Sequence, residues 1–201
     1  MSVLVGRKAP DFTVAAVLPN GEIKSNYNLY EEIKGHYALI FFYPLDFTFV
    51  CPSELIALDH RIEEFKKRQV EVVSVSVDSQ FSHSAYRQVP IKNGGIGPVQ
   101  FTMASDVTHH IAQAYGVEHP VAGVAFRAAF IVGKDAVVRA QIVNDLPIGR
   151  DIDEILRIID AAQFSDEHGE VCPAGWRKGK KGMKASQAGV ASYLAEHEGE
   201  L

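Results

Sequence analysis

The stretch I-F-F-Y-P-L-D-F-T-F-V-C-P-S-E, residues 40–54, decides the fold of this chain. The aromatic, apolar run 37–43 has the length and composition of a buried β-strand. After a short loop, Pro52 occupies a position that proline favours in the first turn of a helix, and Glu54 adds the acidic residue typical of that turn. We therefore expect a helix from Pro52 to about Arg68, joined to the strand by a loop that ends at Cys51.

The position of Cys51 makes it a candidate nucleophile. The expected helix has one apolar face, made by Leu55, Leu58, Ile62 and Phe65. Free backbone N–H groups and the helix dipole at its N-terminus favour an anion, here the Cys51 thiolate. The alternative is a buried cysteine that acts as a small hydrophobic residue, the usual role of an intracellular cysteine.

The neighbours of Cys51 favour the nucleophile. A thiolate that attacks a peroxide needs a hydroxyl close by, a cover against water and a cation on the departing oxygen. Thr48 and Pro44 stand three and seven residues before Cys51 and can supply the first two. The pattern P-x-x-x-T-x-x-C, with its flanking aromatic residues and the P-S-E that follows, resembles the active-site motif of the peroxiredoxins.

A low thiol pKa alone cannot make a fast peroxidase. A thiol with a pKa of about 8.5 is less than a tenth ionised near pH 7.4, so complete ionisation gains roughly tenfold. Nucleophilicity falls with pKa along a Brønsted slope of about 0.4–0.5, so lowering the pKa by ~2.5 loses roughly tenfold. Rapid reduction must therefore come from donors aimed at the charge that builds on the leaving oxygen.

Arg127 is the candidate for that donor. An arginine that begins the apolar strand 127–132 is unusual unless it is paired or lies at the strand end. The segment V-A-G-V-A-F-R-A, residues 121–128, resembles a peroxiredoxin segment, and this resemblance implies that Arg127 belongs to the active site. Glu54 can orient the guanidinium through a bidentate pair, or can act only as a helix N-terminal acid.

Two further residues have both an active-site and a structural interpretation. Arg150, in N-D-L-P-I-G-R, matches a second family arginine, and the resemblance implies that it completes the Glu54 network. Its alternative is a surface residue at a helix start. Tyr43 is a candidate for the pocket as well, or a core tyrosine at a strand end.

The second cysteine, Cys172, lies 121 positions after Cys51 in the segment E-V-C-P-A-G-W. Two widely spaced cysteines differ from the dense disulfide framework of a small secreted domain, and no C-x-x-C motif or zinc-like spacing is present. A sulfenic acid on Cys51 can condense with a nearby thiol. The segment resembles the resolving-cysteine segment of typical 2-Cys peroxiredoxins, which implies an intersubunit Cys51–Cys172 disulfide in a homodimer. The alternative is a spare thiol in a tail.

The remaining elements predict a three-layer α/β architecture. P-N-G at residues 19–21 predicts a hairpin turn. We expect further strands at 70–77, 127–132 and 137–143, and helices at 82–88, 107–115, 151 to about 164 and, weakly, 188–196. Their order resembles a thioredoxin fold with an N-terminal β-hairpin extension. The expected domains are a peroxidase domain at 1–164 and a C-terminal arm at 165–201 that carries Cys172.

Composition excludes several classes of partner. The 201 residues are 47% hydrophobic and 22% charged, which is ordinary for one globular domain with an arm. A net charge of −5 argues against nucleic acid, and the basic residues between 177 and 184 indicate a solvated tail. No apolar stretch reaches the roughly 18 residues of a membrane span, and no signal peptide is apparent. We expect a cytoplasmic protein without a membrane partner.

Weaker signals come from three other segments. The loop N-G-G-I-G-P, residues 93–98, lacks the Lys-Ser/Thr of a phosphate cradle. It approximates a family loop linked to over-oxidation, but Tyr193-Leu194 replaces the usual Tyr-Phe, so sensitivity to hyperoxidation stays open. Tyr86 stands where many relatives carry tryptophan. His109 and His110 point about 100° apart on a helix, which disfavours a metal site.

The expected function is thiol-dependent reduction of hydrogen peroxide and organic hydroperoxides without a bound cofactor. Since the chain has no C-x-x-C motif, thioredoxin or a flavoprotein disulfide reductase must reduce the disulfide. The resemblance spans residues 9–183 and implies a ring of five dimers. Two rivals remain: an oligomeric holdase chaperone that would survive Cys51→Ser, and a general disulfide oxidoreductase, which the lack of a second cysteine near Cys51 disfavours.

Overall fold

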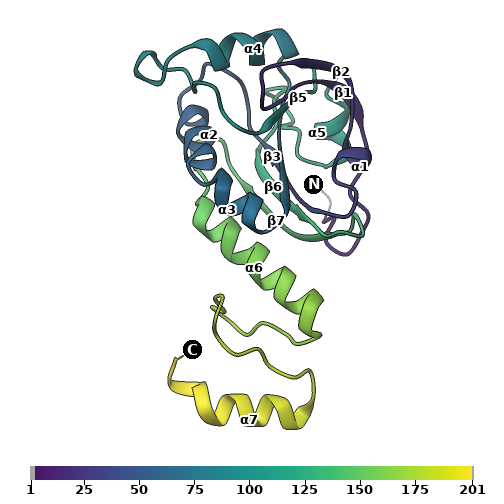
Figure 1. The fold of residues 1–201 in the computed structure, drawn as a ribbon, viewed down its shortest axis with the longest axis vertical. Coiled ribbons are helices and arrows are strands. Elements are labelled where there is room, and N and C mark those ends of the chain that lie inside the picture. The colour runs from purple at the N-terminus through teal and green to yellow at the C-terminus, as the bar shows by residue number, and fades with distance from the viewer. Residues whose placement is uncertain (1–2, 201) are drawn as a thin grey trace. The chain divides into compact units, whose positions relative to one another are not determined.

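A seven-stranded mixed sheet forms the centre of the N-terminal part of the chain (Figure 1). The structure, a computed structural model, describes residues 3–200. The strand order of the sheet is β2-β1-β5-β4-β3-β6-β7. The strands are β1 (Thr13–Val17), β2 (Ile23–Asn28), β3 (Tyr37–Phe42), β4 (Val70–Ser76), β5 (Thr102–Ser105), β6 (Arg127–Val132) and β7 (Val138–Asn144).

The chain divides into two compact units, residues 1–152 and 153–201. The first unit holds helices α1 (Leu29–Glu32), α2 (Cys51–Asp59), α3 (Ile62–Lys67), α4 (Gln80–Gln88) and α5 (His110–Ala114), and the short 3₁₀ turn η1 (Ile91–Asn93). The second holds all but the first residue of α6 (Ile152–His168), then α7 (Gln187–His197) and the turn η2 (Glu198–Glu200).

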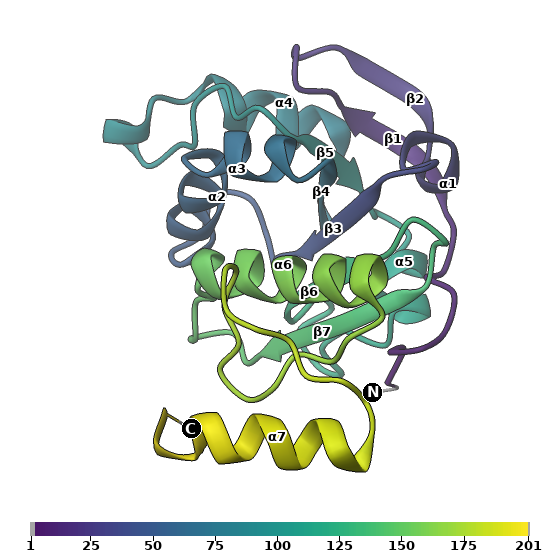
Figure 2. The same cartoon turned by 60° about the horizontal axis from the view of Figure 1, so that its bottom comes forward.

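Strand β3 lies in the interior of the sheet, between β4 and β6, and both of its faces are apolar and buried. It pairs in parallel with β4 and antiparallel with β6, as the sequence pattern predicts for a core strand. Ala38, Ile40 and Phe42 join a core cluster with residues of α1 and α5. Leu39 and Phe41 point to the other face, since successive strand residues alternate. Figures 1 and 2 show α2 and α3 on that second face and α1 and α5 on the first.

The predicted hairpins are confirmed. Strands β1 and β2 pair antiparallel across the turn at 19–21, and β6 and β7 pair antiparallel across residues 133–137. Strand β2 continues to Asn28, whose side chain accepts a hydrogen bond from the Glu31 N–H and caps the short helix α1. Because Asn28 both ends a strand and caps a helix, α1 begins without a loop.

Two helix predictions were wrong in detail, and one strand was missed. The helix expected over 52–68 begins one residue earlier, at Cys51, and is two helices, interrupted at His60 and Arg61, where Arg61 leaves helical geometry with φ −110° and ψ 7°. Strand β5 was not predicted. The helix expected at 107–115 begins only at His110, because β5 runs to Ser105 and the chain then turns through His109 at a positive φ of 63°.

The C-terminal unit begins with α6 and continues as an extended arm. Helix α6 runs past the expected end at Phe164 to His168, so a boundary placed after residue 164 falls inside it. In the arm, Val171 and Met183 exchange backbone hydrogen bonds of 2.9 Å. The Trp176 ring packs on Phe164, with the centroids 4.8 Å apart. None of the helices described over residues 3–200 is long and apolar enough to cross a membrane.

Candidate active site

Cys51 begins helix α2, and its side chain has no solvent-exposed area. Strand β3 ends at Phe42, and an eight-residue loop, 43–50, joins it to the N-terminus of α2. No side chain caps α2 at Val50, so the helix dipole and free N–H groups act on whatever charge Cys51 carries. Pro44 is buried at the start of the loop. The sequence-based location of Cys51 at a strand-to-helix junction is confirmed.

The Thr48 hydroxyl lies between two acceptors. Its Oγ1 is 2.9 Å from the Cys51 Sγ and 2.8 Å from the carbonyl oxygen of Leu45. A hydroxyl has one proton, so Thr48 can donate to only one of them at a time. With a Cys51 thiolate the donor turns toward sulfur, and with a thiol it can turn toward Leu45 while its oxygen accepts from the S–H. The acceptor to which the Thr48 hydroxyl donates therefore depends on the protonation state of Cys51.

Two arginines share the carboxylate of Glu54. Arg127 Nη1 donates to the Cys51 Sγ at 3.4 Å and to Glu54 Oε2 at 2.8 Å, while its Nε donates to the Leu146 carbonyl at 2.5 Å. The backbone N–H and Nε of Arg150 both donate to Glu54 Oε1 at 2.8 Å, and Nη2 donates to Oε2 at 3.1 Å. The bidentate pair expected for Arg127 is thus made by Arg150.

Burial gives this cluster its electrostatic character. Glu54, Arg127 and Arg150 are all buried, and two guanidinium groups face one carboxylate. Burial raises the pKa of Glu54, but the hydrogen bonds and charge of Arg150, together with the charge of Arg127, outweigh it and hold that pKa below its ordinary value. The excess positive charge lies next to sulfur, since Arg127 Nη1 is 3.4 Å from the Cys51 Sγ, and it favours negative charge there.

Strand β3 also holds the second arginine in place. The Arg150 guanidinium carbon lies 3.4 Å from the centre of the Phe41 ring, and Nη1 donates to the Ala128 carbonyl at 2.6 Å. Burial lowers the pKa of Arg150, and Glu54 opposes that shift. Arg150 is therefore fixed from three sides and leaves Arg127 as the guanidinium that reaches sulfur.

Lowering the pH should reduce the free energy of unfolding, because Glu54 becomes protonated. Because its pKa lies below the ordinary 4.5, folded Glu54 stays ionised at a pH where the unfolded chain takes up a proton. Its contribution to stability is complete above the ordinary value and is lost as the pH falls through the lowered pKa. We expect the urea-unfolding free energy to fall more steeply in acid for wild type than for the double variant Glu54→Gln, Arg150→Met. Equal slopes would contradict this linkage.

Tyr43 does not direct its hydroxyl to the cysteine. Its OH donates to Asp46 Oδ1 at 2.7 Å and lies 3.3 Å from Nδ1 of His83, and all three side chains are buried. Burial first, and then the charge of Asp46, raise the pKa of Tyr43 well above its ordinary value. Sequence reasoning missed Asp46 and His83, although the aspartate inside an otherwise apolar motif was a signal that it has a buried partner.

A second buried tyrosine, Tyr86 of α4, packs its ring on Phe47 of the active-site loop at a centroid distance of 4.5 Å. Among the described residues its buried hydroxyl forms no hydrogen bond of adequate geometry, and the Phe47 backbone N–H is at most a weak donor to it. Tyr86→Phe should therefore raise the unfolding free energy by about 1 kcal/mol, whereas Tyr43→Phe should lower it by about 1–2 kcal/mol. Urea unfolding of both variants tests this pair. An equal loss in both would show that Tyr86 has a partner in solution.

Cys172 lies in the C-terminal unit, just after α6. Its thiol donates to the Ala161 carbonyl, with Sγ and oxygen 3.4 Å apart, and neither cysteine is in a disulfide. Burial raises the pKa of the Cys172 thiol, and the nearby Arg157 only partly opposes this. The thiol, and not the thiolate, is therefore the resting form of Cys172.

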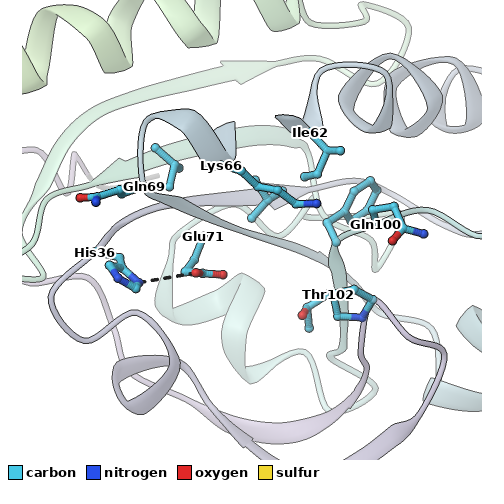
Figure 3. Close-up of a pocket in the computed structure, with 11 residues that line it drawn as sticks. His36, Ile62, Lys66, Gln69, Glu71, Gln100 and Thr102 are labelled. Atoms are coloured by element: carbon cyan, nitrogen blue, oxygen red, sulfur yellow. Dashed lines mark ion pairs between the residues drawn. The ribbon is translucent and has the colours of Figure 1, made fainter. Parts of the chain in front are cut away.

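An open pocket of about 350 Å³ in the N-terminal unit is separate from these residues (Figure 3). Its lining includes the apolar side chains of Ile62 and Phe101 and the polar ones of Lys66 and of the His36–Glu71 pair, whose Nδ1 and Oε1 are 3.5 Å apart. None of the predicted site residues lines it. The candidate active site is therefore the buried cluster at the N-terminus of α2.

Comparison with known proteins identifies the class. The model of the AhpC/TSA family matches residues 5–141, and that of the C-terminal domain of 1-Cys peroxiredoxin matches residues 161–196. Alkyl hydroperoxide reductase C of Helicobacter pylori strain 26695 is 48% identical over 97% of this chain and 98% of that protein. Peroxiredoxin-2 of Macaca fascicularis is 46% identical over 96% of both chains.

Solved structures agree with this grouping. Reduced Plasmodium vivax 2-Cys peroxiredoxin superposes with a TM-score of 0.93 at 45% identity, covering 96% of this chain and 100% of that one. The chain belongs to the AhpC/TSA family, the peroxiredoxins. The predictions of a thiol-dependent peroxidase, of the 2-Cys type and of a thioredoxin fold are thereby confirmed. The named relatives give no support to the holdase alternative.

Proposed function

We propose that the chain reduces hydrogen peroxide and organic hydroperoxides at Cys51. The observation that carries this is a fully buried sulfur with the Thr48 hydroxyl at 2.9 Å and the Arg127 guanidinium at 3.4 Å. The thiolate attacks one peroxide oxygen, so an S–O bond forms while the O–O bond breaks. The other oxygen leaves as water or alcohol after taking up a proton. Thr48 and Arg127 are the donors that can stabilise the reacting oxygens.

Cys172 is the second thiol of the proposed cycle. Its thiol gives up its proton as the sulfur attacks the Cys51 sulfenic acid, so an S–S bond forms, the S–O bond breaks and the hydroxyl leaves with that proton as water. A disulfide needs the two Cα atoms about 4.4–6.8 Å apart. Because Cys51 is buried in the first turn of α2, the loop 43–50 and that turn must rearrange before the bond can form. We assign the partner thiol to the second subunit of a homodimer.

The remaining parts of the cycle follow from its chemistry. We propose that a dithiol donor, either thioredoxin or a flavoprotein disulfide reductase, reduces the disulfide, and that the cycle runs in the cytoplasm. A pentamer of dimers is the assembly we propose. A related Plasmodium yoelii Prx1a forms an artifactual octamer when it is modified at its N-terminus.

Non-reducing electrophoresis after one equivalent of hydrogen peroxide tests the proposal. We expect a band at dimer mass in wild type that Cys51→Ser and Cys172→Ser each abolish. Peroxide consumption should vanish in Cys51→Ser, while Cys172→Ser should still react once and stop at the oxidised cysteine. An oxidised wild type at monomer mass would refute the intersubunit bond. Peroxide turnover by Cys51→Ser would refute the whole assignment.

A further inference from the structure

A buried polar cluster connects helix α4 to the active-site loop, and the reaction as described makes no use of it. Its centre is Asp46, five residues before Cys51. Asp46 Oδ2 accepts hydrogen bonds from the Ser82 hydroxyl at 2.8 Å and from His83 Nδ1 at 2.9 Å. Oδ1 accepts from Tyr43 at 2.7 Å. The carboxylate thus has three donors from two elements.

The His83 ring lies between a carboxylate and a backbone carbonyl. Its Nδ1 faces the Asp46 carboxylate, and its Nε2 lies 3.3 Å from the Ala104 carbonyl oxygen of β5. With a proton on Nδ1, the ring donates a hydrogen bond to the carboxylate. His83 has no exposed area, and a buried carboxylate is stable only when paired and hydrogen-bonded. Asp46 and His83 therefore hold each other in place.

The backbone around Asp46 is fixed as well. Its N–H donates to Asp78 Oδ2 at 2.8 Å, and the Ser76 hydroxyl holds that same oxygen at 2.7 Å. The preceding residue, Leu45, provides the carbonyl that accepts from Thr48 Oγ1. The position of Asp46 thus sets both the peptide that Thr48 contacts and the start of the chain that leads to Cys51.

We propose that His83 and Ser82 are positioning residues for peroxide reduction: by holding Asp46 they keep the Thr48 hydroxyl within hydrogen-bond distance of the Cys51 sulfur. The inference rests on the proposed roles of Cys51 and Thr48. Helix α4 carries none of the reacting groups, and it acts on them through the loop 43–50. A misplacement of about 1 Å in a catalytic group can cost on the order of a hundredfold in rate.

The test is the rate at which the Cys51 thiol of the full chain is oxidised by hydrogen peroxide, followed by rapid quenching and mass spectrometry. We expect His83→Leu to lower the second-order rate constant by about a hundredfold. His83→Asn, which keeps a donor for Asp46, should restore most of that loss. Ser82→Ala removes one hydrogen bond at a half-buried position and should cost about threefold to tenfold.

The matched control is His109→Asn. His109 also pairs with a carboxylate, Glu118, at 2.7 Å, but it lies before α5, and asparagine tolerates its positive φ of 63°. We expect its rate constant to stay within twofold of wild type. A loss in the control as large as that of His83→Leu would overturn the proposal, because a carboxylate-paired histidine away from the loop would then matter equally.

A double-mutant cycle with Thr48→Val separates positioning from general damage. If α4 acts through Thr48, His83→Leu should cost almost nothing once Thr48→Val has removed the hydroxyl. If the rate losses of the two single variants instead multiply in the double variant, the inference is overturned and the proposed function stays intact. If Thr48→Val alone had no effect, the proposed role of Thr48 would fall, and this inference with it. Should His83→Leu not fold, as judged by urea unfolding, Ser82→Ala takes its place in the same cycle.

Discussion

Thr48→Val should slow the oxidation of Cys51 by hydrogen peroxide by about a hundredfold to a thousandfold, the cost of removing one preorganised donor from a transition state. Valine nearly matches threonine in shape, so the buried pocket keeps its volume while the hydroxyl is lost. Because this hydroxyl is 2.9 Å from the sulfur, the loss falls on the chemical step. Rapid-quench measurement of thiol loss gives the rate constant directly.

Thr48→Ser is the control, since it keeps the hydroxyl and removes only a methyl group. We expect a rate constant within about tenfold of wild type. The Thr48→Val protein should remain as stable as wild type to within about 1–2 kcal/mol, because the residue is only half-buried. Equal rates for the valine and serine variants would show that the hydroxyl does not take part.

Arg150→Met should lower the free energy of unfolding by about 3–5 kcal/mol, which is large against the total stability of a domain. The substitution leaves the Glu54 carboxylate buried with one guanidinium in place of two. Methionine fills much of the space beside Phe41, so the cost comes from the side-chain hydrogen bonds and the positive charge that Glu54 loses rather than from a cavity. Urea unfolding with a constant m-value measures it.

The second substitution Glu54→Gln should recover most of that stability, because it removes the charge that Arg150→Met exposes. Lys67→Met provides the comparison at the surface: its ammonium pairs with Glu64 at 2.6 Å, but both side chains are exposed, and we expect a change below about 1 kcal/mol. A similar small effect for Arg150→Met would contradict the view that the Glu54 cluster is a tightly coupled buried network.

The local elements of the fold could be predicted because they rest on strong short-range signals. The apolar run that forms β3, the Pro-Ser-Glu start of α2 and the turns at 19–21 and 133–136 each show in a few consecutive residues. Strand β5 could not be predicted because four residues carry too little periodicity to distinguish a strand from a loop. Its place in the sheet comes from pairing with β1 and β4, which is a long-range contact.

The same contrast between local and long-range signals holds for the active site. Thr48 and Cys51 are three positions apart, so their contact could be inferred from spacing, and family resemblance pointed to Arg127 and Arg150. The pairing of Asp46 with His83 joins residues 37 positions apart, and no local pattern shows it. The division of labour between the two arginines also depends on the fold, since only the sheet decides which guanidinium lies nearer to sulfur.

The single tryptophan of the chain gives it an optical label. Trp176 follows Cys172 by four residues, is buried, and donates from Nε1 to the Lys180 carbonyl at 3.1 Å. Position 86, beside the loop that leads to Cys51, holds a tyrosine instead. Light absorbed by indole is therefore emitted only from the segment around Cys172, and its intensity reports a rearrangement of that segment without any dye. A time course of intrinsic fluorescence can thus follow the arm in unmodified protein.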